Sequence, residues 1–342
     1  MGRRIAFCAD GTWDTITNDT NVYRLSKAIC AISGEHYSFY DDGVGSDGTP
    51  IDKLLGGAIG LGLFQKIKDG YSTIASVYEA GDEVFIFGFS RGAYTARSLA
   101  GMIAGCGLPT KNPDTNLVNT VFQAYRNRGQ RQAILGTLGA YGLVPATMTM
   151  VGVWDTVGAL GIPAIVGGVD PVLFGFLDTG LHPDILNAYH AVAIDERRAE
   201  FPATLWVPPF SPQQTVEQAY FVGVHCDVGG GYADDAGSGT ALSDITFSWM
   251  MKKAAQLGLV FDAGVLADYP SPIDQKDALD TKHESWSPLW LFPKSRTIAQ
   301  NATLANSVVV RCQNDSSYRP GNLAFTVNGV PAGTYGTEVV VA

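Results

Sequence analysis

The stretch EVFIFGFSRGAYTARSLAG, residues 83–101, decides the fold class of this chain. It opens with the apolar run Val84–Phe87, which is typical of a strand buried on both faces of a sheet. The pentapeptide GFSRG (88–92) then places Ser90 between two glycines, and the alanines after it favour a helix. A strand, a tight turn around a serine and a helix make a nucleophile elbow, in which the glycines permit a strained backbone that exposes the hydroxyl. The alternative is an ordinary strand-to-helix turn with Ser90 as the N-cap.

Strand, glycine-bearing loop and helix alternate along the rest of the chain. This order predicts an α/β fold with a mostly parallel sheet and helices on both of its faces. We expect strands at 3–8, 36–40, 83–89, 147–153 and 219–224, and helices that include 22–32, 67–78, 93–106 and 249–256. Ligands of parallel sheets bind beyond the carboxyl ends of the strands. Each expected strand delivers a polar residue there, namely Asp10, Asp41, Ser90, Asp155 and His225.

No linker, repeat or low-complexity segment divides the chain, so a single domain over residues 1–342 is expected. Apolar groups among glycines and prolines indicate a lid-like insertion at about 157–215, which would either contact an acyl chain or pack on the sheet. The C-terminal residues, about 323–342, contain Asn328-Gly329 and predict an edge hairpin. Helix caps are expected at Thr20 and at Ser243 or Asp244.

The composition excludes several classes of protein. With 23 basic and 33 acidic side chains the net charge is −10, which disfavours nucleic acid and charge-driven docking on anionic membranes. Hydrophobic residues make up 46% of the chain, enough for a large core. No apolar stretch reaches the ~20 residues of a membrane span, the N-terminus lacks the apolar segment of a signal peptide, and the five cysteines are scattered. A cytoplasmic location is therefore expected.

A serine nucleophile needs a base, and the base needs a carboxylate to orient it. In hydrolases with this kind of sheet the three follow in the order Ser, Asp, His. Asp155 ends the segment MTMVGVWD and His225 ends AYFVGVH, so both the order and the strand-end positions fit. The alternatives are that Asp155 caps a helix and that His225 is a packed histidine.

The other histidines are less suited to act as the base. His283, in a polar loop, is the second choice, whereas His36 begins a strand and His182 precedes a proline. His190 lies in a helix-like segment (190–198) with Asp195, Glu196, Arg197 and Arg198, which would either support the site from behind or form a solvated helical face.

An oxyanion hole would combine the backbone N–H of Arg91 with that of Gly11 or Thr12, from the loop after the first strand. Asp10 is expected to turn away from an oxyanion and to tie its own loop through hydrogen bonds. A metal site formed by Asp10, His225 and Asp227 is an alternative, although Asp227 more simply holds the glycine turn beside it. We therefore expect neither a metal nor a cofactor. Two rival motifs are incomplete: Cys8 occupies the nucleophile position of aspartate-based phosphatases, and no Gly-Lys-Ser/Thr follows the glycines of 43–62.

Several motifs together resemble one known family. They are FCADGTW (7–13), GVG (43–45), GFSRGAYTARSLAG (88–101), GVWDTVGALG (152–161), HAVAIDERR (190–198), GVHCDVGGGY (223–232), LSDITFSWM (242–250) and YRPGNL (318–323). In this order they resemble the DUF2235 family, which includes the catalytic domain of type VI secretion phospholipase effectors of the Tle1 type. The resemblance implies an α/β-hydrolase fold and a phospholipase A activity that uses serine, aspartate and histidine. The matching positions are Ser90, Asp155 and His225.

The expected function is that of a serine hydrolase that cleaves carboxylic esters, most of all a phospholipase or lipase-type esterase. An esterase or thioesterase for a small soluble substrate is the first alternative, and a non-catalytic binding module on a hydrolase scaffold is the second. The resemblance implies further partners, an immunity protein or the secretion apparatus, and export without a signal peptide if the chain is an effector. Transient contact with a membrane surface through the apolar lid is a further expectation.

Overall fold

The computed structural model describes most of the chain. The described residues are 2–11, 19–29, 35–43, 57–146, 148–157, 180–232, 241–268, 275–290, 292–326, 329, 331–332 and 336–338. Much of the expected lid, residues 158–179, lies outside them, as does Thr12.

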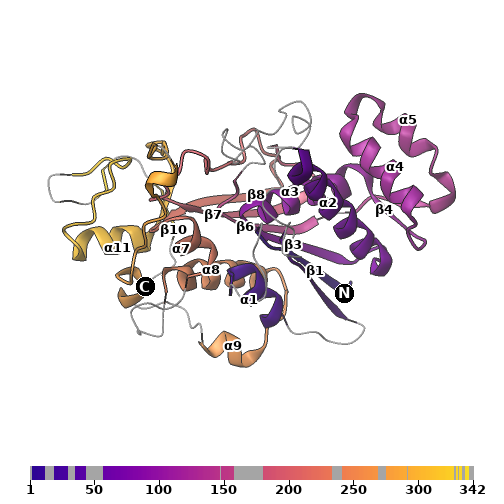
Figure 1. The fold of residues 1–342 in the computed structure, drawn as a ribbon. Coiled ribbons are helices and arrows are strands. Elements are labelled where there is room, and N and C mark those ends of the chain that lie inside the picture. The colour runs from indigo at the N-terminus through magenta and orange to yellow at the C-terminus, as the bar shows by residue number, and fades with distance from the viewer. Residues whose placement is uncertain are drawn as a thin grey trace.

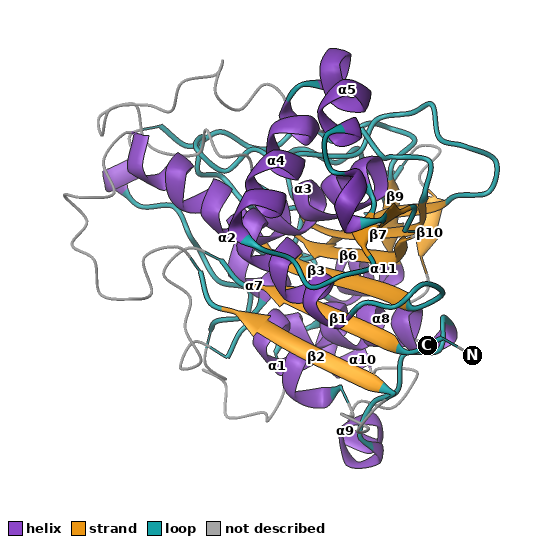
Figure 2. Cartoon of the chain, turned by 90° about the vertical axis from the view of Figure 1, so that its right-hand side faces the viewer, coloured by secondary structure: helices purple, strands orange, loops and turns teal. Residues whose placement is uncertain are grey.

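The centre of the molecule is an eight-stranded sheet in which every pairing is parallel (Figures 1 and 2). A separate two-stranded antiparallel sheet joins β4 (Leu108–Pro109) to β5 (Leu143–Val144). The prediction of a mostly parallel α/β sheet is therefore confirmed. In spatial order the strands of the large sheet are β2 (His36–Asp41), β1 (Arg4–Ala9), β3 (Glu83–Phe89), β6 (Met148–Trp154), β7 (Ile185–Ala193), β8 (Thr215–Phe221), β9 (Thr303–Ala305) and β10 (Gly336–Glu338).

Helices cover both faces of this sheet, because its strands carry apolar side chains on both sides (Figure 2). In β1, Ile5 and Phe7 join one core while Ala6 and Cys8 join the other. The first core is covered by α2 (Gly57–Val77), α3 (Ser90–Cys106) and α4 (Thr115–Arg126), and the second by α1 (Asn21–Ala28), α8 (Leu242–Gln256) and α11 (Asn306–Asn314). The remaining α-helices of the described chain are α5 (Arg131–Gly136), α7 (His225–Gly229), α9 (Ala263–Asp268) and α10 (Gln275–Ala278).

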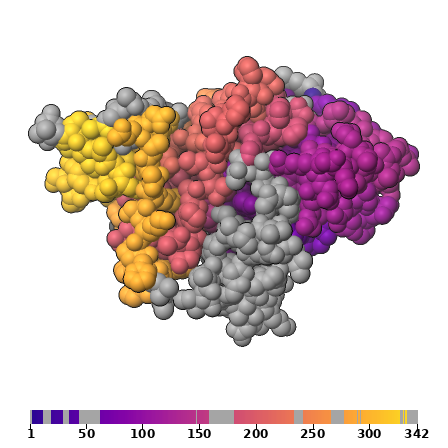
Figure 3. All heavy atoms as spheres, turned by 90° about the horizontal axis from the view of Figure 1, so that it is seen from above, coloured from indigo at the N-terminus to yellow at the C-terminus, as the bar shows by residue number. Residues whose placement is uncertain are grey.

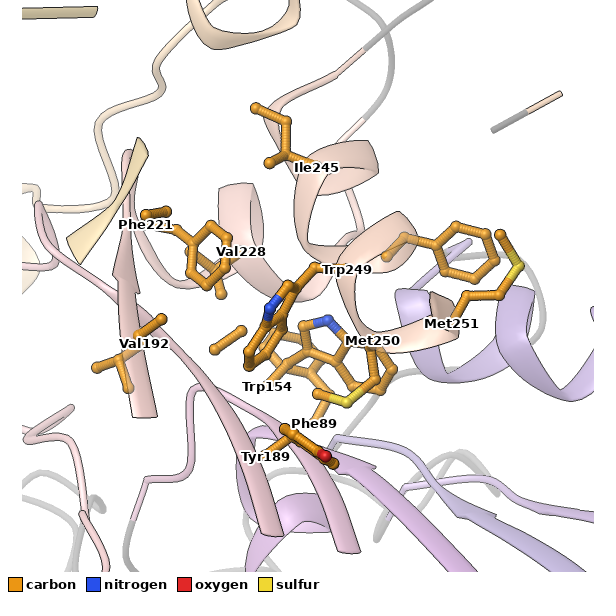
Figure 4. Close-up of a cluster of buried hydrophobic side chains, with 14 of the residues drawn as sticks. Phe89, Trp154, Tyr189, Val192, Phe221, Val228, Ile245, Trp249, Met250 and Met251 are labelled. Atoms are coloured by element: carbon orange, nitrogen blue, oxygen red, sulfur yellow. The ribbon is translucent and has the colours of Figure 1, made fainter. Parts of the chain in front are cut away.

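Large side chains fill the second core beneath the carboxyl ends of the central strands. Trp154, the last residue of β6, is fully buried and lies among Phe89, Trp249 and Met250 (Figure 4). Trp154 and Phe89 directly precede Asp155 and Ser90. This packing therefore fixes the ends of two strands from which candidate site residues emerge.

The main error of the sequence-based prediction concerns β7. Residues 190–198 were expected to be helix-like, but His190 lies inside β7, between β6 and β8. A strand buried on both faces shows no apolar–polar alternation, and its alanines favour a helix in isolation, so tertiary pairing overrides the local preference. The same strand occupies residues 185–193 of the expected lid-like insertion, so that part belongs to the sheet.

The predicted helix ends and C-terminus are correct in part. Thr20 caps α1, where its Oγ1 accepts the N–H of Tyr23 at 3.1 Å. Asp244 lies in the first turn of α8 and accepts the N–H of Ala241, which is the N-cap. Near the C-terminus, an antiparallel bridge joins Phe325 and Pro331, after which β10 extends the edge of the sheet in parallel with β9.

The C-terminal part of the chain lies at the opposite end of the molecule from α4 and α5 (Figures 1 and 3). The segment that leads to it, residues 281–298, passes the carboxyl ends of β7 and β8, where Lys294 donates its N–H to the carbonyl oxygen of Arg197. No helix in the described ranges is long and apolar enough to cross a bilayer.

Candidate active site

Ser90 occupies a strained turn between β3 and α3. Its φ of 58° lies in the left-handed region that residues with a Cβ rarely adopt. The flanking glycines are required by close backbone contacts: a Cβ on Gly88 would lie 2.7 Å from the Cα of Ala93, and one on Gly92 would lie 2.6 Å from the carbonyl carbon of Asp10. The N-cap of α3 is Phe89, which makes no side-chain cap bond, so Ser90 is not an ordinary cap. This is the backbone geometry of a nucleophile elbow.

The structure joins Ser90, His225 and Asp155 in one chain of hydrogen bonds. Ser90 Oγ donates to Nε2 of His225 at 2.8 Å, and Nδ1 of His225 donates to Oδ2 of Asp155 at 2.6 Å. All three side chains are buried; Ser90 and Asp155 follow β3 and β6, and His225 is the first residue of α7. Asp155 also has a left-handed backbone, with φ 39°. Strained residues held by their surroundings are typical of functional sites.

Three carboxylates hold the turn that leads into His225. Asp227 Oδ2 accepts the N–H of Val224 at 2.9 Å, and Asp195 Oδ2 accepts the N–H of Gly223 at 2.7 Å. Glu196 Oε2 accepts the N–H of His225 itself at 3.2 Å. The imidazole ring is further enclosed by Phe89 and Phe201, whose ring centroids lie 4.5 and 5.1 Å away. The position of His225 is therefore determined by its backbone and by the aromatic rings that contact its own ring.

Electrostatics keeps Asp155 ionised and His225 neutral. Burial alone would raise the pKa of Asp155, but the charge of Arg296 and the hydrogen bonds from His225 and Arg296 hold this pKa far below its ordinary value. Burial lowers the pKa of His225, against the hydrogen bond to Asp155 that raises it. A neutral imidazole can accept the proton of Ser90, as a general base must.

The carboxyl group of Asp10 is hydrogen-bonded to the residues around it. Oδ1 accepts the N–H of Gly11 at 2.8 Å, while Oδ2 accepts the hydroxyls of Thr20 at 2.5 Å and Tyr40 at 2.8 Å. Burial raises the pKa of Asp10. Because Asp10 already uses the N–H of Gly11, that donor is not free for an oxyanion in this arrangement. Arg91 lies in the first turn of α3, next to Ser90.

The remaining candidates lie around the three hydrogen-bonded residues rather than among them. Nε2 of His190 accepts the N–H of Thr156 at 3.0 Å, directly after Asp155, and burial lowers the pKa of His190 to about 3. His283 was the second choice for the base. Its Nδ1 donates to Oδ1 of Asp227 at 2.5 Å, so this nitrogen is bonded to Asp227. Asp10, His225 and Asp227 do not converge, and among the described residues no three His, Cys, Asp or Glu side chains are grouped as a metal would require.

Sequence reasoning missed one charged group at the site, Arg296, and named a second, Glu196, only as a member of the 190–198 segment. Arg296 contacts both carboxylate oxygens of Asp155, at 2.5 and 2.8 Å. Glu196 is completely buried and pairs with Arg198; burial would raise the pKa of Glu196, but the hydrogen bonds and charge of Arg198 lower it to about 2. Arg296 belongs to no recognisable motif, whereas Glu196 lies within HAVAIDERR (190–198). A further signal for Glu196 is its place beside Asp195, directly after an apolar run.

Comparisons with known proteins agree with this fold. Residues 3–253 match the sequence model of the family described as the catalytic domain of Tle1-like phospholipase effectors of the type VI secretion system (T6SS). The uncharacterized protein YEL023C of Saccharomyces cerevisiae is 32% identical over 142 residues, which cover 36% of this chain and 20% of the yeast protein. The chain thus spans a fifth of that relative.

Two solved structures are similar to this one. An uncharacterized protein from Pseudomonas aeruginosa has a TM-score of 0.51 and 19% identity, over 78% of this chain and 49% of that one. A Tle1 effector, solved bound to the VgrG spike of the type VI secretion system, has a TM-score of 0.39 and 17% identity, over 70% of this chain and 52% of its own. The first of these likenesses bears on the fold alone. With the family match covering most of its length, this chain belongs to the family of Tle1-like phospholipase effector catalytic domains.

Proposed function

We propose that this protein is a serine ester hydrolase in which Ser90, His225 and Asp155 form the catalytic triad. The observation that carries the proposal is the continuous chain of hydrogen bonds from Ser90 Oγ through both ring nitrogens of His225 to Asp155. The strained backbone of Ser90 and its position at the carboxyl edge of a parallel sheet support the same assignment.

The reaction would proceed through an acyl-enzyme. His225 Nε2 takes the proton of Ser90 as Oγ attacks the ester carbonyl, and Asp155 stabilises the imidazolium that forms. The backbone N–H of Arg91, together with one from the loop of Gly11 and Thr12, would bind the oxyanion. The hydrogen bond from the N–H of Gly11 to Asp10 Oδ1 would first have to break. His225 then protonates the leaving alcohol, and a water molecule activated by His225 hydrolyses the acyl group from Ser90.

A phospholipid is the substrate class that the family membership favours. The net charge of −10 makes apolar contact, rather than attraction to anionic headgroups, the expected way to reach a lipid surface. The expected lid would supply such contact, and its first part, residues 158–179, lies outside the described residues. A small soluble ester or thioester stays the alternative substrate.

The remaining expectations rest on the family alone. If this chain acts as the type VI effectors of its family do, its partners are the secretion apparatus and an immunity protein, and it leaves the cell without a signal peptide. The cytoplasmic location stays a prediction for the protein before export, and no cofactor is needed for the proposed chemistry.

A fluorophosphonate probe tests the proposal directly, because it reacts covalently with an activated serine. We expect the full chain to be labelled, S90A to be unlabelled, and S98A to be labelled like the wild type. Ser98 is the matched control, since it is a buried serine two turns further along α3. An unlabelled wild type, or labelling that persists in S90A, would refute the serine hydrolase and leave a non-catalytic binding module as the better interpretation.

The substrate class is a separate measurement. Initial rates on p-nitrophenyl esters of increasing acyl length, and on phosphatidylcholine vesicles, distinguish the two candidates. A lipase-type enzyme gains activity with chain length and releases fatty acid from the vesicles. A rate that falls with chain length, with no release from vesicles, would favour the soluble ester.

A further inference from the structure

Arg296 is buried against Asp155, and the described residues account for all five of its N–H donors. Nη1 donates to Oδ1 of Asp155 at 2.5 Å and to the carbonyl of Ala193 at 2.8 Å. Nη2 donates to Oδ2 of Asp155 and to the carbonyl of Phe201, both at 2.8 Å, and Nε donates to the Phe201 carbonyl at 3.3 Å. A guanidinium so completely bonded has one orientation, and it imposes that orientation on the carboxylate.

The carboxylate of Asp155 is likewise fully occupied. Besides Arg296, Oδ1 accepts the N–H of Ala193 at 2.9 Å, and Oδ2 accepts Nδ1 of His225. Asp155 therefore shares its charge between a permanent cation and the imidazole. In an isolated Asp–His pair the carboxylate acts on the imidazole alone.

Arg296 comes from a segment that lies beyond the residues matched by the family model. The same segment and the residues that follow it contact the other carboxyl groups around His225. Ser285 donates to Glu196 at 2.8 Å, His283 donates to Asp227 at 2.5 Å, and, further on, Tyr318 donates to Asp195 at 2.9 Å. Four carboxylates near His225 are thus each bonded by a residue between positions 283 and 318.

We propose that Arg296 is a positioning residue for the reaction proposed above. It holds both oxygens of Asp155 in place, and its positive charge weakens the electrostatic attraction between this carboxylate and the imidazolium form of His225. Two effects follow. The imidazole is kept in the orientation that reaches Ser90, and it stays a weaker base than an uncompensated Asp–His pair would make it. The enzyme retains a neutral base in more acidic solution, at the cost of weaker stabilisation of the imidazolium.

The charged groups that face His225 determine how its pKa should change when Arg296 is replaced. They are Asp155 after β6, Asp195, Glu196 and Arg198 after β7, Asp227 in α7 with its partner His283, and Arg296 from the later segment. Glu196 and Arg198 neutralise each other as an ion pair. Removing the charge of Arg296 therefore leaves Asp155 as the uncompensated charge nearest the imidazole, and the pKa of His225 should rise.

The experiment compares R296Q, R296K and the wild-type chain by NMR titration of His225 and by the pH dependence of kcat/KM on a soluble ester. The resonance of His225 is assigned by its loss in H225Q. R311Q is the matched control, because Arg311 is also buried and bonds two backbone carbonyls, those of Ala278 and Asp280, away from the site. Circular dichroism and thermal unfolding report whether each variant is folded.

In R296Q we expect the pKa of His225 and the acidic limb of kcat/KM to rise by about one pH unit, and kcat to fall at least tenfold. R296K keeps a positive charge but not the two-pronged geometry, so the pKa should change little while kcat falls several-fold. R311Q should lower the unfolding temperature without moving the pKa. A folded R296Q with the wild-type pKa would overturn the proposal; if R296Q does not fold, wild-type kcat in R296K would do so.

This inference rests on the proposed function, and the NMR titration separates the two. The titration needs no turnover, so an inactive wild-type protein would refute the hydrolase while the pKa of His225 could still be compared. An active wild type whose His225 pKa is unaffected in R296Q would refute the role of Arg296 alone.

Discussion

The first turn of helix α3 rests directly on the backbone at the end of strand β1: a Cβ on Gly92 would lie 2.6 Å from the carbonyl carbon of Asp10. The carbonyl oxygens of Ala9 and Asp10 are also in contact with this position. The contact brings the turn of Ser90 and Arg91 against the loop that begins at Gly11. Any second oxyanion donor from that loop depends on this close approach.

Alanine at position 92 should therefore damage the site. We expect G92A to lower kcat/KM at least a hundredfold, because the added methyl group pushes α3 away from the β1 loop and displaces Ser90 from His225. G101A is the matched control in the same helix, where the nearest side-chain atom is 3.6 Å away. That change should leave activity intact and stabilise the helix by up to about 1 kcal/mol. Equal activity of the two variants would contradict the prediction.

Replacing Asp155 by asparagine should affect activity and stability in different ways. We expect D155N to lower kcat by about 10⁴, since the amide no longer stabilises the imidazolium. The variant should also lose roughly 3–5 kcal/mol of unfolding free energy, because Arg296 becomes a buried charge without its partner. The double variant D155N/R296Q should regain much of the stability and none of the activity. Urea unfolding and initial rates provide the two measurements.

The pH dependence of the wild-type activity follows from the shift of His225. Only the neutral imidazole accepts the proton of Ser90, so kcat/KM falls as the pH drops through the pKa of His225. Burial lowers this pKa below its ordinary value of 6.5. The acidic limb of the profile should accordingly have its midpoint below 6.5 in a titration from pH 4 to 8. A midpoint above 7 would show that Asp155 outweighs burial.

His190 should make the protein less stable in mild acid. Burial lowers the pKa of His190 to about 3 in the folded state, from its ordinary value of 6.5, so between these pH values the unfolded chain binds the extra proton. Stability is complete above pH 6.5 and falls as the pH decreases toward 3, by about 1.4 kcal/mol per pH unit. H190Q can still accept the N–H of Thr156 and should lose less stability between pH 7 and 4.5. Urea unfolding at both pH values tests this, and equal losses would count against it.

Replacing Phe292 tests whether the protein acts at a lipid surface or on a soluble substrate. Its side chain is 80% exposed, and its neighbour Pro293 forms a backbone bridge with Arg198, close to His225. We expect F292A to slow hydrolysis of phosphatidylcholine vesicles several-fold and to leave a short soluble ester unaffected. V260A is the control, because Val260 is 39% exposed and lies near Gly258, which adjoins Arg4 at the amino end of β1. Equal effects on both substrates in F292A would speak against a lipid contact there.

The residues around Ser90 show why much of the fold could be predicted. The boundaries of β3 are those expected, and α3 begins three residues earlier than expected, because a buried strand, two obligatory glycines and an alanine-rich helix are local features of the sequence. The capping of α1 by Thr20 is local in the same way. β7 could not be predicted, since its apolar run follows no strand periodicity and its conformation depends on pairing with β6 and β8.

The sequence by itself determined the alternating parallel architecture and the order in which Ser90, Asp155 and His225 follow along the chain, because strand periodicity, turn chemistry and spacing are properties of short segments. Only the tertiary structure decided which groups surround them. Arg296 is separated from Asp155 by 141 residues and His283 from Asp227 by 56, and no local pattern marks either pair. Such partners are selected by burial: a carboxylate removed from water must be paired, and the partner is whichever donor the fold brings within reach.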